Sequence, residues 1–292
     1  MYSIKKEQKL CIGTANFGFN YGLNKKKSLR IDNIKKILLH AKKNKIKYLD
    51  TAISYKSAEK KIGESNIKNF KIISKIHRVP KRVKKIDKWI IEKVKTSCKN
   101  LKIKSLYGLL LHDTNELKDK KKSKKIFKAF DYLIKKKIVK KVGLSIYNKE
   151  ELNLHLKKFN FKIVQLPINI FDHRISNSHW LDYLKKRRIQ IFARSVFLKG
   201  LLLKDKSKIN RKFKKWKKNF ENFDNWTKIK NISKEEACIR YIKNFNQIDK
   251  IIVGVNNKDQ LNKNLMNVCK KGINIPKKFK VNDENLLNPK NW

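Results

Sequence analysis

The sequence predicts a single-domain α/β protein folded as a (β/α)8 TIM barrel, and three observations support this. The 292 residues match the length of one such barrel. Short apolar runs alternate with stretches of helical periodicity along the whole chain, which is typical of parallel strands joined by helices. Eight strand–helix units follow one another across residues 1–292 with no Pro- or Gly-rich linker. Eight units in this length favour a closed barrel over an open doubly wound sheet.

The predicted strands are short runs that are largely apolar, as expected for strands covered on both faces. Residues 109–111 are three leucines, and residues 251–253 are Ile-Ile-Val. In chain order we expect strands over 10–14, 47–50, 71–75, 106–111, 141–145, 163–166, 190–195 and 250–253.

The segments between these runs place apolar residues at positions i, i+3 and i+4, which is the pattern of an amphipathic helix. In 31–43, for example, Ile34, Ile37, Leu38 and Ala41 share one stripe. We expect helices over 31–43, 57–65, 87–101, 124–136, 149–158, 180–187, 234–244 and 259–271.

The alternation is interrupted after the seventh strand by a long connection rich in Lys, Phe and Trp, residues 199–232. Connections of this length usually are functional or contain extra helices. Trp216, Phe220, Phe223 and Trp226 have helical spacing within it. We expect this series to pack against the barrel; a lid over the site is the alternative.

The formal net charge of +52 would attract nucleic acid or other polyanions. However, 67 of the 76 basic residues are Lys and only 9 are Arg, whereas nucleic-acid readers depend on the bidentate guanidinium. Ile and Asn are also abundant, and all three have AT-rich codons. We therefore interpret the charge as compositional drift of the solvated surface and expect no specific nucleic-acid partner.

Other compositional features favour a cytoplasmic protein. No apolar run approaches the roughly 18 residues of a membrane span, and Lys-rich residues 1–10 are not followed by the apolar stretch of a signal peptide. The four cysteines, Cys11, Cys98, Cys238 and Cys269, lack metal-site spacing. We expect a reducing compartment, no membrane association, no metal, and a monomer or weak homo-oligomer.

Four polar residues fall at the carboxyl ends of three consecutive strands, the face on which barrel enzymes carry their catalytic groups. Asp50 ends the second strand, Tyr55 lies in the loop after it, Lys75 ends the third strand, and His112 follows the fourth. Each residue alone also has a structural explanation. Asp50 could cap a helix, and Tyr55 could be a core residue. Lys75 could be one more surface lysine, and His112 a packed histidine. Together they indicate a catalytic set.

These residue types suit carbonyl reduction. Hydride addition leaves charge on the carbonyl oxygen, so Tyr55 can act as the acid, although the pKa of a free phenol, about 10, is high for that role. We expect Lys75 to lower the pKa of Tyr55 and Asp50 to hold Lys75 in place. His112 would donate to the substrate oxygen and orient the carbonyl. The hydride must come from a cofactor, because no side chain supplies one.

The chain resembles the aldo/keto reductase family over nearly its whole length, and within it a bacterial branch often linked to surface-polysaccharide genes. The matching segments occur in family order at barrel spacing, at 13–18, 48–52 with Tyr55 and Glu59, 74–75, 109–112, 142–145, 164–169, 193–198 and 254–264.

The resemblance implies that Asp50, Tyr55, Lys75 and His112 are the catalytic tetrad and that the cofactor is NADPH, with NADH as an alternative. The cofactor-binding residues that it implies are Thr14, Ser145, Gln165, Arg194, Ser195, Leu198, Gly200, Gly254, Lys258, Gln260 and Asn264. Beside these, we expect Phe17, Phe19 and Tyr21 to wall the substrate pocket and His173 to contact a polar substrate.

The sequence departs from the family pattern at four positions. Lys56 replaces the Gly that usually follows the catalytic Tyr, and Arg194 stands where many members stack an aromatic ring on the nicotinamide. Ile146 replaces an Asn, and Gln260 aligns with the basic residue that often binds the NADP 2′-phosphate. Lys258 lies close to that position.

The function predicted from the sequence is NAD(P)H-dependent reduction of an aldehyde or ketone to the alcohol, with a sugar-like substrate expected from the branch resemblance. Two alternatives remain open. One is a catalytically silent barrel that binds cofactor in a regulatory role, and the other is a basic polyanion-binding protein.

Overall fold

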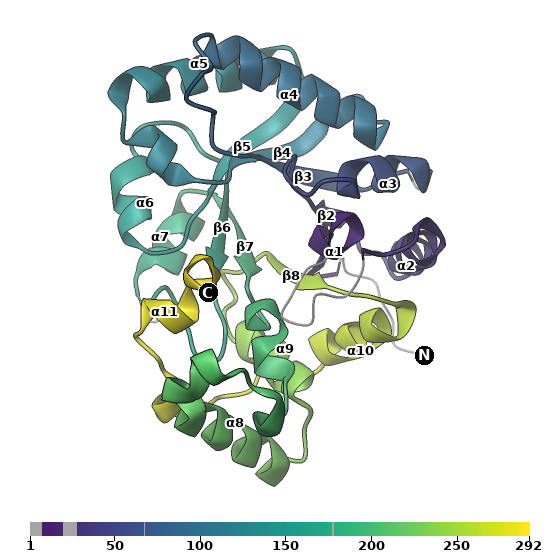
Figure 1. Cartoon of the computed structure of the whole chain (residues 1–292), viewed down its shortest axis with the longest axis vertical. Helices are drawn as coiled ribbons and strands as arrows, with labels where there is room; N and C mark the ends of the chain where they lie inside the picture. The colour runs from purple at the N-terminus through teal and green to yellow at the C-terminus, as the bar shows by residue number, and fades with distance from the viewer. Residues whose placement is uncertain (1–7, 20–27, 67, 177) are drawn as a thin grey trace.

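The computed structural model describes residues 8–19, 28–66, 68–176 and 178–292 and has eight parallel strands in a closed barrel. Each strand pairs with the next in the chain, and β8 closes on β1 (Figure 1). The strands are β1 (Leu10–Gly13), β2 (Tyr48–Asp50), β3 (Lys71–Ile76), β4 (Leu106–Leu111), β5 (Val139–Ser145), β6 (Ile163–Pro167), β7 (Gln190–Arg194) and β8 (Lys250–Gly254). The predicted (β/α)8 barrel is confirmed, with strand ends within two residues of those expected.

Helices follow the strands and cover the outside of the barrel. They are α1 (Ala15–Gly18), α2 (Ile31–Lys43), α3 (Ala58–Glu64), α4 (Ile86–Leu101), α5 (Lys120–Lys135), α6 (Glu150–His155), α7 (Trp180–Lys186), α8 (Lys217–Ile229), α9 (Lys234–Lys243), α10 (Lys258–Cys269) and α11 (Glu284–Leu287). All eight expected helices are present.

Two of the expected helix boundaries were wrong. Helix α5 begins at Lys120 rather than at residue 124, because the Asp119 side chain caps it by accepting a hydrogen bond from the backbone N–H of Lys122. Its first turn contains no apolar residue, so periodicity could not reveal it. Helix α6 ends at His155 rather than at residue 158.

The long connection after β7 contains three 3-10 segments and α8. Phe220 and Phe223 of α8 are buried, and both rings contact Phe171 edge-on, at centroid distances of 5.3 and 6.1 Å. Phe223 also contacts Phe279 at 5.8 Å. The apolar stripe of α8 therefore packs against neighbouring elements, as expected, rather than standing over the site as a lid.

Side chains fill the barrel interior, so it is a packed core and not a pore. Cys11, Ile73, Leu110, Ile163 and Phe192 meet there and are fully buried. A larger core lies between the strands and the surrounding helices. Since the interior is filled, any substrate site must lie at a rim of the barrel.

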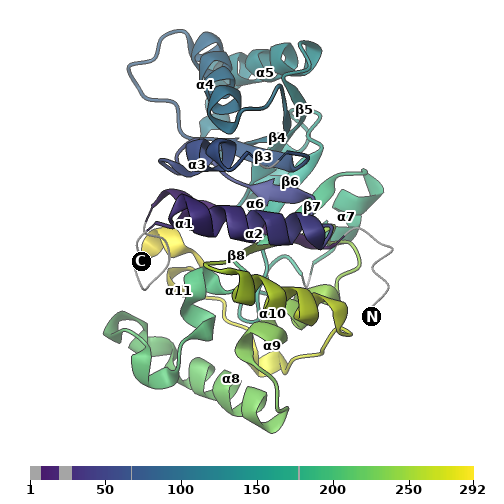
Figure 2. The same ribbon diagram turned by 90° about the vertical axis from the view of Figure 1, so that its right-hand side faces the viewer.

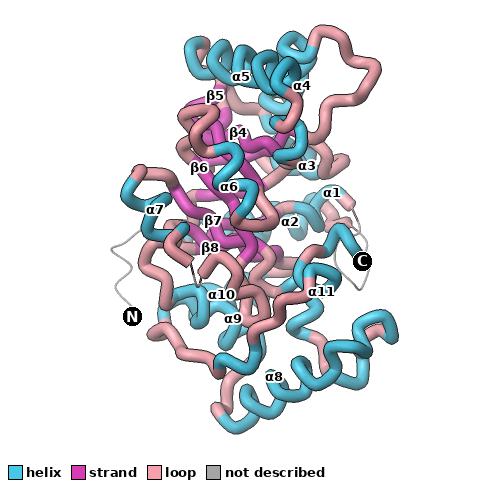
Figure 3. The backbone as a smooth tube through the Cα atoms, turned by 90° about the vertical axis from the view of Figure 1, so that its left-hand side faces the viewer, coloured by secondary structure: helices cyan, strands magenta, loops and turns pink. Residues whose placement is uncertain are grey.

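The carboxyl-terminal rim of the barrel, which we call the mouth, is marked by α1, the segment that follows β1. Figure 2 shows α1 and α11 on the same side of the molecule, opposite the first described residues, and Figure 3 shows the same arrangement from the other side. Residues far apart in the sequence thus meet at the mouth.

No helix in the described part of the chain is long and apolar enough to cross a membrane. Cys11, Cys98 and Cys238 are buried, whereas Cys269, the last residue of α10, is exposed.

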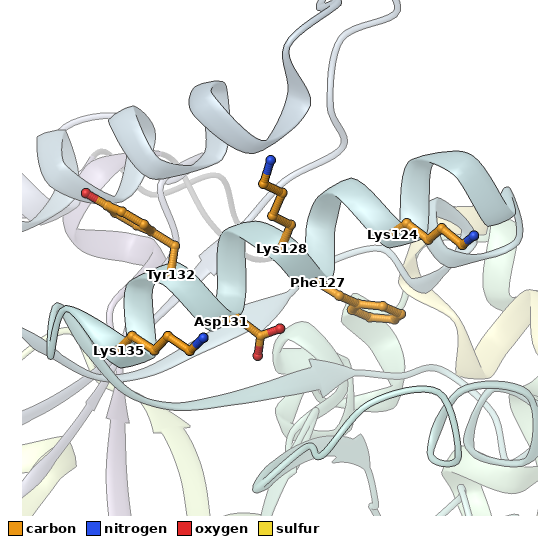
Figure 4. A pocket seen from close by; sticks show the side chains of 6 residues that line it. All are labelled: Lys124, Phe127, Lys128, Asp131, Tyr132 and Lys135. Atoms are coloured by element: carbon orange, nitrogen blue, oxygen red, sulfur yellow. The ribbon is translucent and has the colours of Figure 1, made fainter.

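Much of the positive charge faces solvent on the outer helices. An open groove along α5, shown in Figure 4, is lined by Lys124, Phe127, Lys128, Asp131, Tyr132 and Lys135. The groove lies on the outer helical layer, away from the mouth; its three lysines are exposed, and Lys128 points toward α4, where it forms an ion pair with Asp87 at 3.6 Å. This placement fits a solvated basic surface.

Candidate active site

The barrel brings the predicted tetrad together at the mouth. Asp50 ends β2, Lys75 lies near the end of β3, and His112 directly follows β4. These three strands are neighbours, and the backbone N–H of His112 donates to the carbonyl of Ile76 at 2.9 Å, which continues the β3–β4 alignment.

Lys75 and Asp50 form a buried ion pair. The Lys75 ammonium donates to both Asp50 carboxylate oxygens, at 2.6 and 2.7 Å, and to the carbonyl of Thr51 at 2.9 Å. The side chains are only 2% and 8% exposed. An ammonium group has three N–H donors, so all three are used within this cluster.

Tyr55 is held by a tight loop against α1. Its N–H donates to the Ala52 carbonyl, and its own carbonyl accepts from Ala58, both at 2.9 Å. A Cβ atom on Gly18 would lie 1.8 Å from the Tyr55 carbonyl oxygen, so only glycine lets α1 approach the loop this closely. The Phe19 ring lies 5.7 Å from the Tyr55 ring, so the structure brings these two predicted site residues together.

The expectation that Lys75 lowers the pKa of Tyr55 is wrong. Burial raises the pKa of Tyr55 well above its ordinary value, and the nearby Asp50 carboxylate raises it further, against the opposing effect of Arg194. Lys75 lies 5.4 Å from the centre of the Tyr55 ring, but its donors are directed to Asp50 and Thr51. Tyr55 therefore keeps its proton at neutral pH and can serve as a proton donor.

His112 is a neutral imidazole at physiological pH. Burial lowers its pKa to about 3, and the charges of Lys75, Arg194 and Lys290 act in the same direction, whereas Asp113 opposes them. The His112 and Tyr55 rings meet edge to face at 6.2 Å. A neutral imidazole retains one N–H donor that can be directed at a substrate oxygen.

This lowered pKa predicts an acid-sensitive contribution of His112 to stability. Between the unfolded value of about 6.5 and the folded value of about 3, the unfolded chain binds more protons, so the free energy of unfolding decreases as the pH is lowered through this range. We expect His112→Gln to lose less stability than the wild type between pH 7 and pH 4.5, measured by urea denaturation. Equal losses would contradict this.

Two residues at the mouth, Tyr147 and Lys290, were not predicted from the sequence. The Arg194 guanidinium lies 4.2 Å from the centre of the Tyr147 ring, and the Lys290 ammonium lies 4.0 Å from the same point. Arg194 also donates to the carbonyl of Ile146 at 2.6 Å and to Ser195 Oγ at 3.1 Å. Tyr147 follows β5 by two residues, which was the only signal available, and Lys290 is one of 67 lysines.

Several predicted cofactor residues lie around the tetrad. Thr14 donates to the Asp50 carbonyl at 3.0 Å. Ser145 and Gln165 are paired neighbours on β5 and β6, both almost fully buried, and the Gln165 amide donates to the Asp50 carboxylate. Thr14 directly follows β1, so these residues come from three different parts of the barrel, and two of them, Thr14 and Gln165, contact Asp50.

The remaining predicted cofactor residues lie on loops and on α10. The loop after β7 has left-handed backbone at Ser195 (φ 58°), Leu198 (φ 46°) and Gly200 (φ 86°). The Leu198 side chain is fully buried, so only its backbone is available to a ligand. Gly254, the last residue of β8, is exposed, as are Lys258 and Gln260 on α10, whereas Asn264 of α10 is buried.

The predictions for Phe17 and His173 were wrong. Phe17 is fully buried in the core, because the turn of α1 directs it away from solvent. His173 is 5% exposed, its Nε2 lies 2.7 Å from the carbonyl of Ile170, and its ring packs on Tyr241 of α9 at 5.4 Å. Neither side chain is available to a substrate; Tyr21 lies outside the described residues.

Comparison with known proteins decides which family this constellation represents. A sequence model of the Aldo/keto reductase family matches residues 9–274. The chain belongs to the aldo/keto reductase family. It is therefore an NAD(P)H-dependent oxidoreductase, and the family's reaction is carbonyl reduction.

Solved structures agree on the fold. The aldo-keto reductase AKR11C1 from Bacillus halodurans, in its holo form, superposes with a TM-score of 0.73 at 17% identity over 91% of this chain and 88% of that one. The PA4992 protein from Pseudomonas aeruginosa gives a TM-score of 0.67 at 17% identity over 90% of each chain. No curated protein sequence gives a significant match.

In this aldo/keto reductase, Lys56 adopts a backbone conformation that suits the glycine more usual in the family. Its φ is 44°, in the left-handed region. We expect Lys56→Gly to raise the free energy of unfolding by roughly 0.5 to 1 kcal/mol, because it relieves the penalty of a left-handed side-chain-bearing residue. Lys60→Gly, inside α3, should instead lower it by about 1 kcal/mol. Thermal denaturation of both variants checks this, and a destabilised Lys56→Gly would contradict it.

The mouth fits a bound nicotinamide nucleotide. Buried polar atoms there lack a hydrogen-bond partner in the described structure, among them Gln165 Oε1, Arg194 Nε and Asn16 Oδ1. Buried polar atoms are normally satisfied, so these three are available to a polar ligand. A Cβ on Gly200 would meet nothing within 4 Å, which leaves open space above the loop after β7.

Proposed function

We propose that the chain reduces an aldehyde or ketone with NADPH and that Tyr55 donates the proton to the carbonyl oxygen. The observation that carries this proposal is the buried Lys75–Asp50 ion pair beside a protonated Tyr55 and a neutral His112. A proton donor, a paired cation and a hydrogen-bond donor thus lie close together at the mouth.

Each member of the tetrad has a distinct task. Tyr55 holds the proton at its phenolic oxygen until negative charge develops on the substrate oxygen. His112 donates a hydrogen bond to the same oxygen and orients the carbonyl. Lys75 lies 5.4 Å from the centre of the Tyr55 ring, and its ion pair with Asp50 neutralises the neighbouring carboxylate.

When bound, the dinucleotide supplies the hydride. Ser145 and Gln165 are the residues we propose to bind its carboxamide, and Thr14, directly after β1, and Arg194, at the end of β7, would also contact the nucleotide. Residues 195–200 would bind the pyrophosphate through backbone N–H groups, since left-handed turns form concave anion sites. Gly254, Lys258, Gln260 and Asn264 would bind the adenosine end.

Lys258 favours NADPH over NADH. It is exposed at the first position of α10 and has no ion-pair partner among the described residues, whereas Gln260 Oε1 already accepts from the backbone N–H of Asn256 at 2.8 Å. We expect Lys258→Gln to raise the KM for NADPH about tenfold and to leave that for NADH unchanged, because a charge-assisted contact to the 2′-phosphate is lost. Lys263→Gln, which removes the same charge elsewhere on α10, should change neither, and a parallel rise for both nucleotides would contradict the assignment.

The experiment that tests the proposed function is fluorescence titration of the purified protein with NADPH and NADH at moderate salt, together with turnover of a panel of aldehydes, ketones and sugar-like carbonyls. Saturable binding with turnover is the expected result. Binding without turnover would support a regulatory barrel. Absence of binding, with salt-sensitive retention on nucleic acid, would support the polyanion-binding alternative.

A further inference from the structure

The mouth carries an imbalance of charge. The carboxylates of the described residues around it are paired with cations: Asp113 contacts Arg78 at 2.7 Å, and Arg174 contacts both Asp172 at 2.9 Å and Glu284 at 2.8 Å. Asp50 is likewise neutralised by Lys75. The remaining carboxylate near Tyr147 among the described residues, Glu151, accepts hydrogen bonds from Thr114 and from the backbone N–H groups of Tyr147 and Asn148, so none of these carboxylates is paired with a further cation.

Lys290 is such a further cation. It is exposed, and its ammonium forms no ion pair with any carboxylate in the described parts of the chain; its contact is with the face of the Tyr147 ring, at 4.0 Å. Arg194 lies 4.2 Å from the same ring centre and also has no carboxylate partner there. Tyr147 therefore holds two cations that remain able to bind an anion.

Lys290 is held in place rather than carried on a loose chain. It belongs to residues 283–292, which we call the mouth segment. This segment is tied to the barrel by the Glu284–Arg174 pair and by a hydrogen bond from Lys199 Nζ to the Pro289 carbonyl at 3.2 Å.

The end of the mouth segment is fixed by aromatic packing. The Trp292 ring contacts Phe213 edge-on at 5.0 Å, and its indole N–H donates to the Asn285 carbonyl at 3.0 Å. Because the backbone around Lys290 is already ordered, little freedom is lost when its ammonium binds a ligand.

The two cations also face the reacting groups. Both Lys290 and Arg194 lower the pKa of His112, and Arg194 opposes the rise in the pKa of Tyr55. Their charges therefore reach the space in which the carbonyl must lie.

We propose that the carbonyl substrate carries an anionic group, a carboxylate or a phosphate, which Lys290 binds beside Arg194 at the rim of the mouth. This inference rests on the proposed function, since the anion is placed relative to a carbonyl held by Tyr55 and His112. It assigns Lys290 and Tyr147 to substrate specificity: Lys290 binds the anion, and Tyr147 is a positioning residue for both cations.

Two matched substrate pairs test this proposal and distinguish the two anions. Kinetics with NADPH would compare 5-oxopentanoate with pentanal, and glyceraldehyde 3-phosphate with glyceraldehyde. For at least one pair, kcat/KM of the charged member should be about tenfold or more above that of the neutral member. Lys290→Met should remove most of this preference through KM, with kcat and the neutral member little changed.

Lys135→Met is the matched control, because it removes one exposed lysine charge from α5, away from the mouth. If the preference were due to the overall field of the chain, both variants would reduce it equally. The same comparison can be made without turnover. Calorimetry would measure the dissociation constants of 5-oxopentanoate and of pentanal for the Tyr55→Phe variant saturated with NADPH.

The outcomes separate this inference from the proposed function. Equal values for charged and neutral members, in a protein that binds NADPH and loses turnover in Tyr55→Phe, would overturn the anion site alone. Equal effects of Lys290→Met and Lys135→Met would overturn it as well. Failure to bind either nucleotide would overturn the proposed function and this inference together.

Discussion

The Tyr55→Phe variant is expected to lose about 10²- to 10⁴-fold in kcat, which is the contribution typical of a positioned general acid. The substitution removes only the phenolic O–H. The ring contacts with Phe19 and His112 remain, so the mouth keeps its shape. Steady-state kinetics on the best substrate of the panel measures the loss, and fluorescence titration should give an unchanged Kd for NADPH.

Tyr132→Phe is the control for this substitution, because Tyr132 is exposed on α5 and lines the outer groove. It should leave kcat unaltered. A Tyr55→Phe variant with wild-type kcat would show that another group donates the proton, and Tyr147 would be the next residue to replace, since its hydroxyl is close enough to raise the pKa of Tyr55.

Lys75→Met is expected to lower the free energy of unfolding by about 3 to 5 kcal/mol, the usual effect of removing one partner from a buried ion pair. Asp50 is 5% exposed and would lose the cation that faces both of its oxygens. The Thr51 carbonyl would also lose its donor. Urea denaturation followed by circular dichroism measures the change.

A double-mutant cycle separates the ion pair from simple loss of packing. Asp50→Asn in the Lys75→Met background removes the isolated charge, so the double variant should be more stable than the sum of the two single changes predicts. Additive losses would contradict a strong interaction between Lys75 and Asp50. Turnover should be low in all three variants, because each disturbs the groups beneath Tyr55.

The fold was predictable because its strands are covered on both faces. Such strands form contiguous apolar runs, and the runs at 106–111 and 250–253 gave strand positions within a residue of those observed. The first turn of α5 was missed because the Asp119 cap stabilises it and most of its residues are lysines. It therefore has no apolar residues from which helical periodicity could be recognised. Where a segment is exposed and burial does not determine its residue types, its secondary structure cannot be predicted from hydrophobic periodicity.

The position of the catalytic set was predictable for a topological reason. Asp50, Lys75 and His112 each lie at or just after a strand end, and parallel neighbours bring those ends together. Their ionisation was not predictable in the same way. The pKa of Tyr55 is raised by burial and by the nearby Asp50 carboxylate, and both effects depend on tertiary packing that the local sequence does not reveal.

The residues that were misassigned or missed depend on tertiary packing. Phe17 and Phe19 are two positions apart, yet one is in the core and the other beside Tyr55. Lys290 reaches Tyr147 only because the mouth segment folds back across the barrel. No local pattern distinguishes this lysine from the others.

The four cysteines lie at different depths, so they can report how the molecule opens. Cys269 is exposed and should react with a thiol reagent at once. Cys98 and Cys238 lie on the buried faces of α4 and α9, where burial raises the pKa of Cys98 to about 11, so both should be modified only when those helices detach. Cys11 lies inside the barrel and should react last, after the strands part. Counting adducts over time by mass spectrometry would show whether the outer layer loosens before the sheet does.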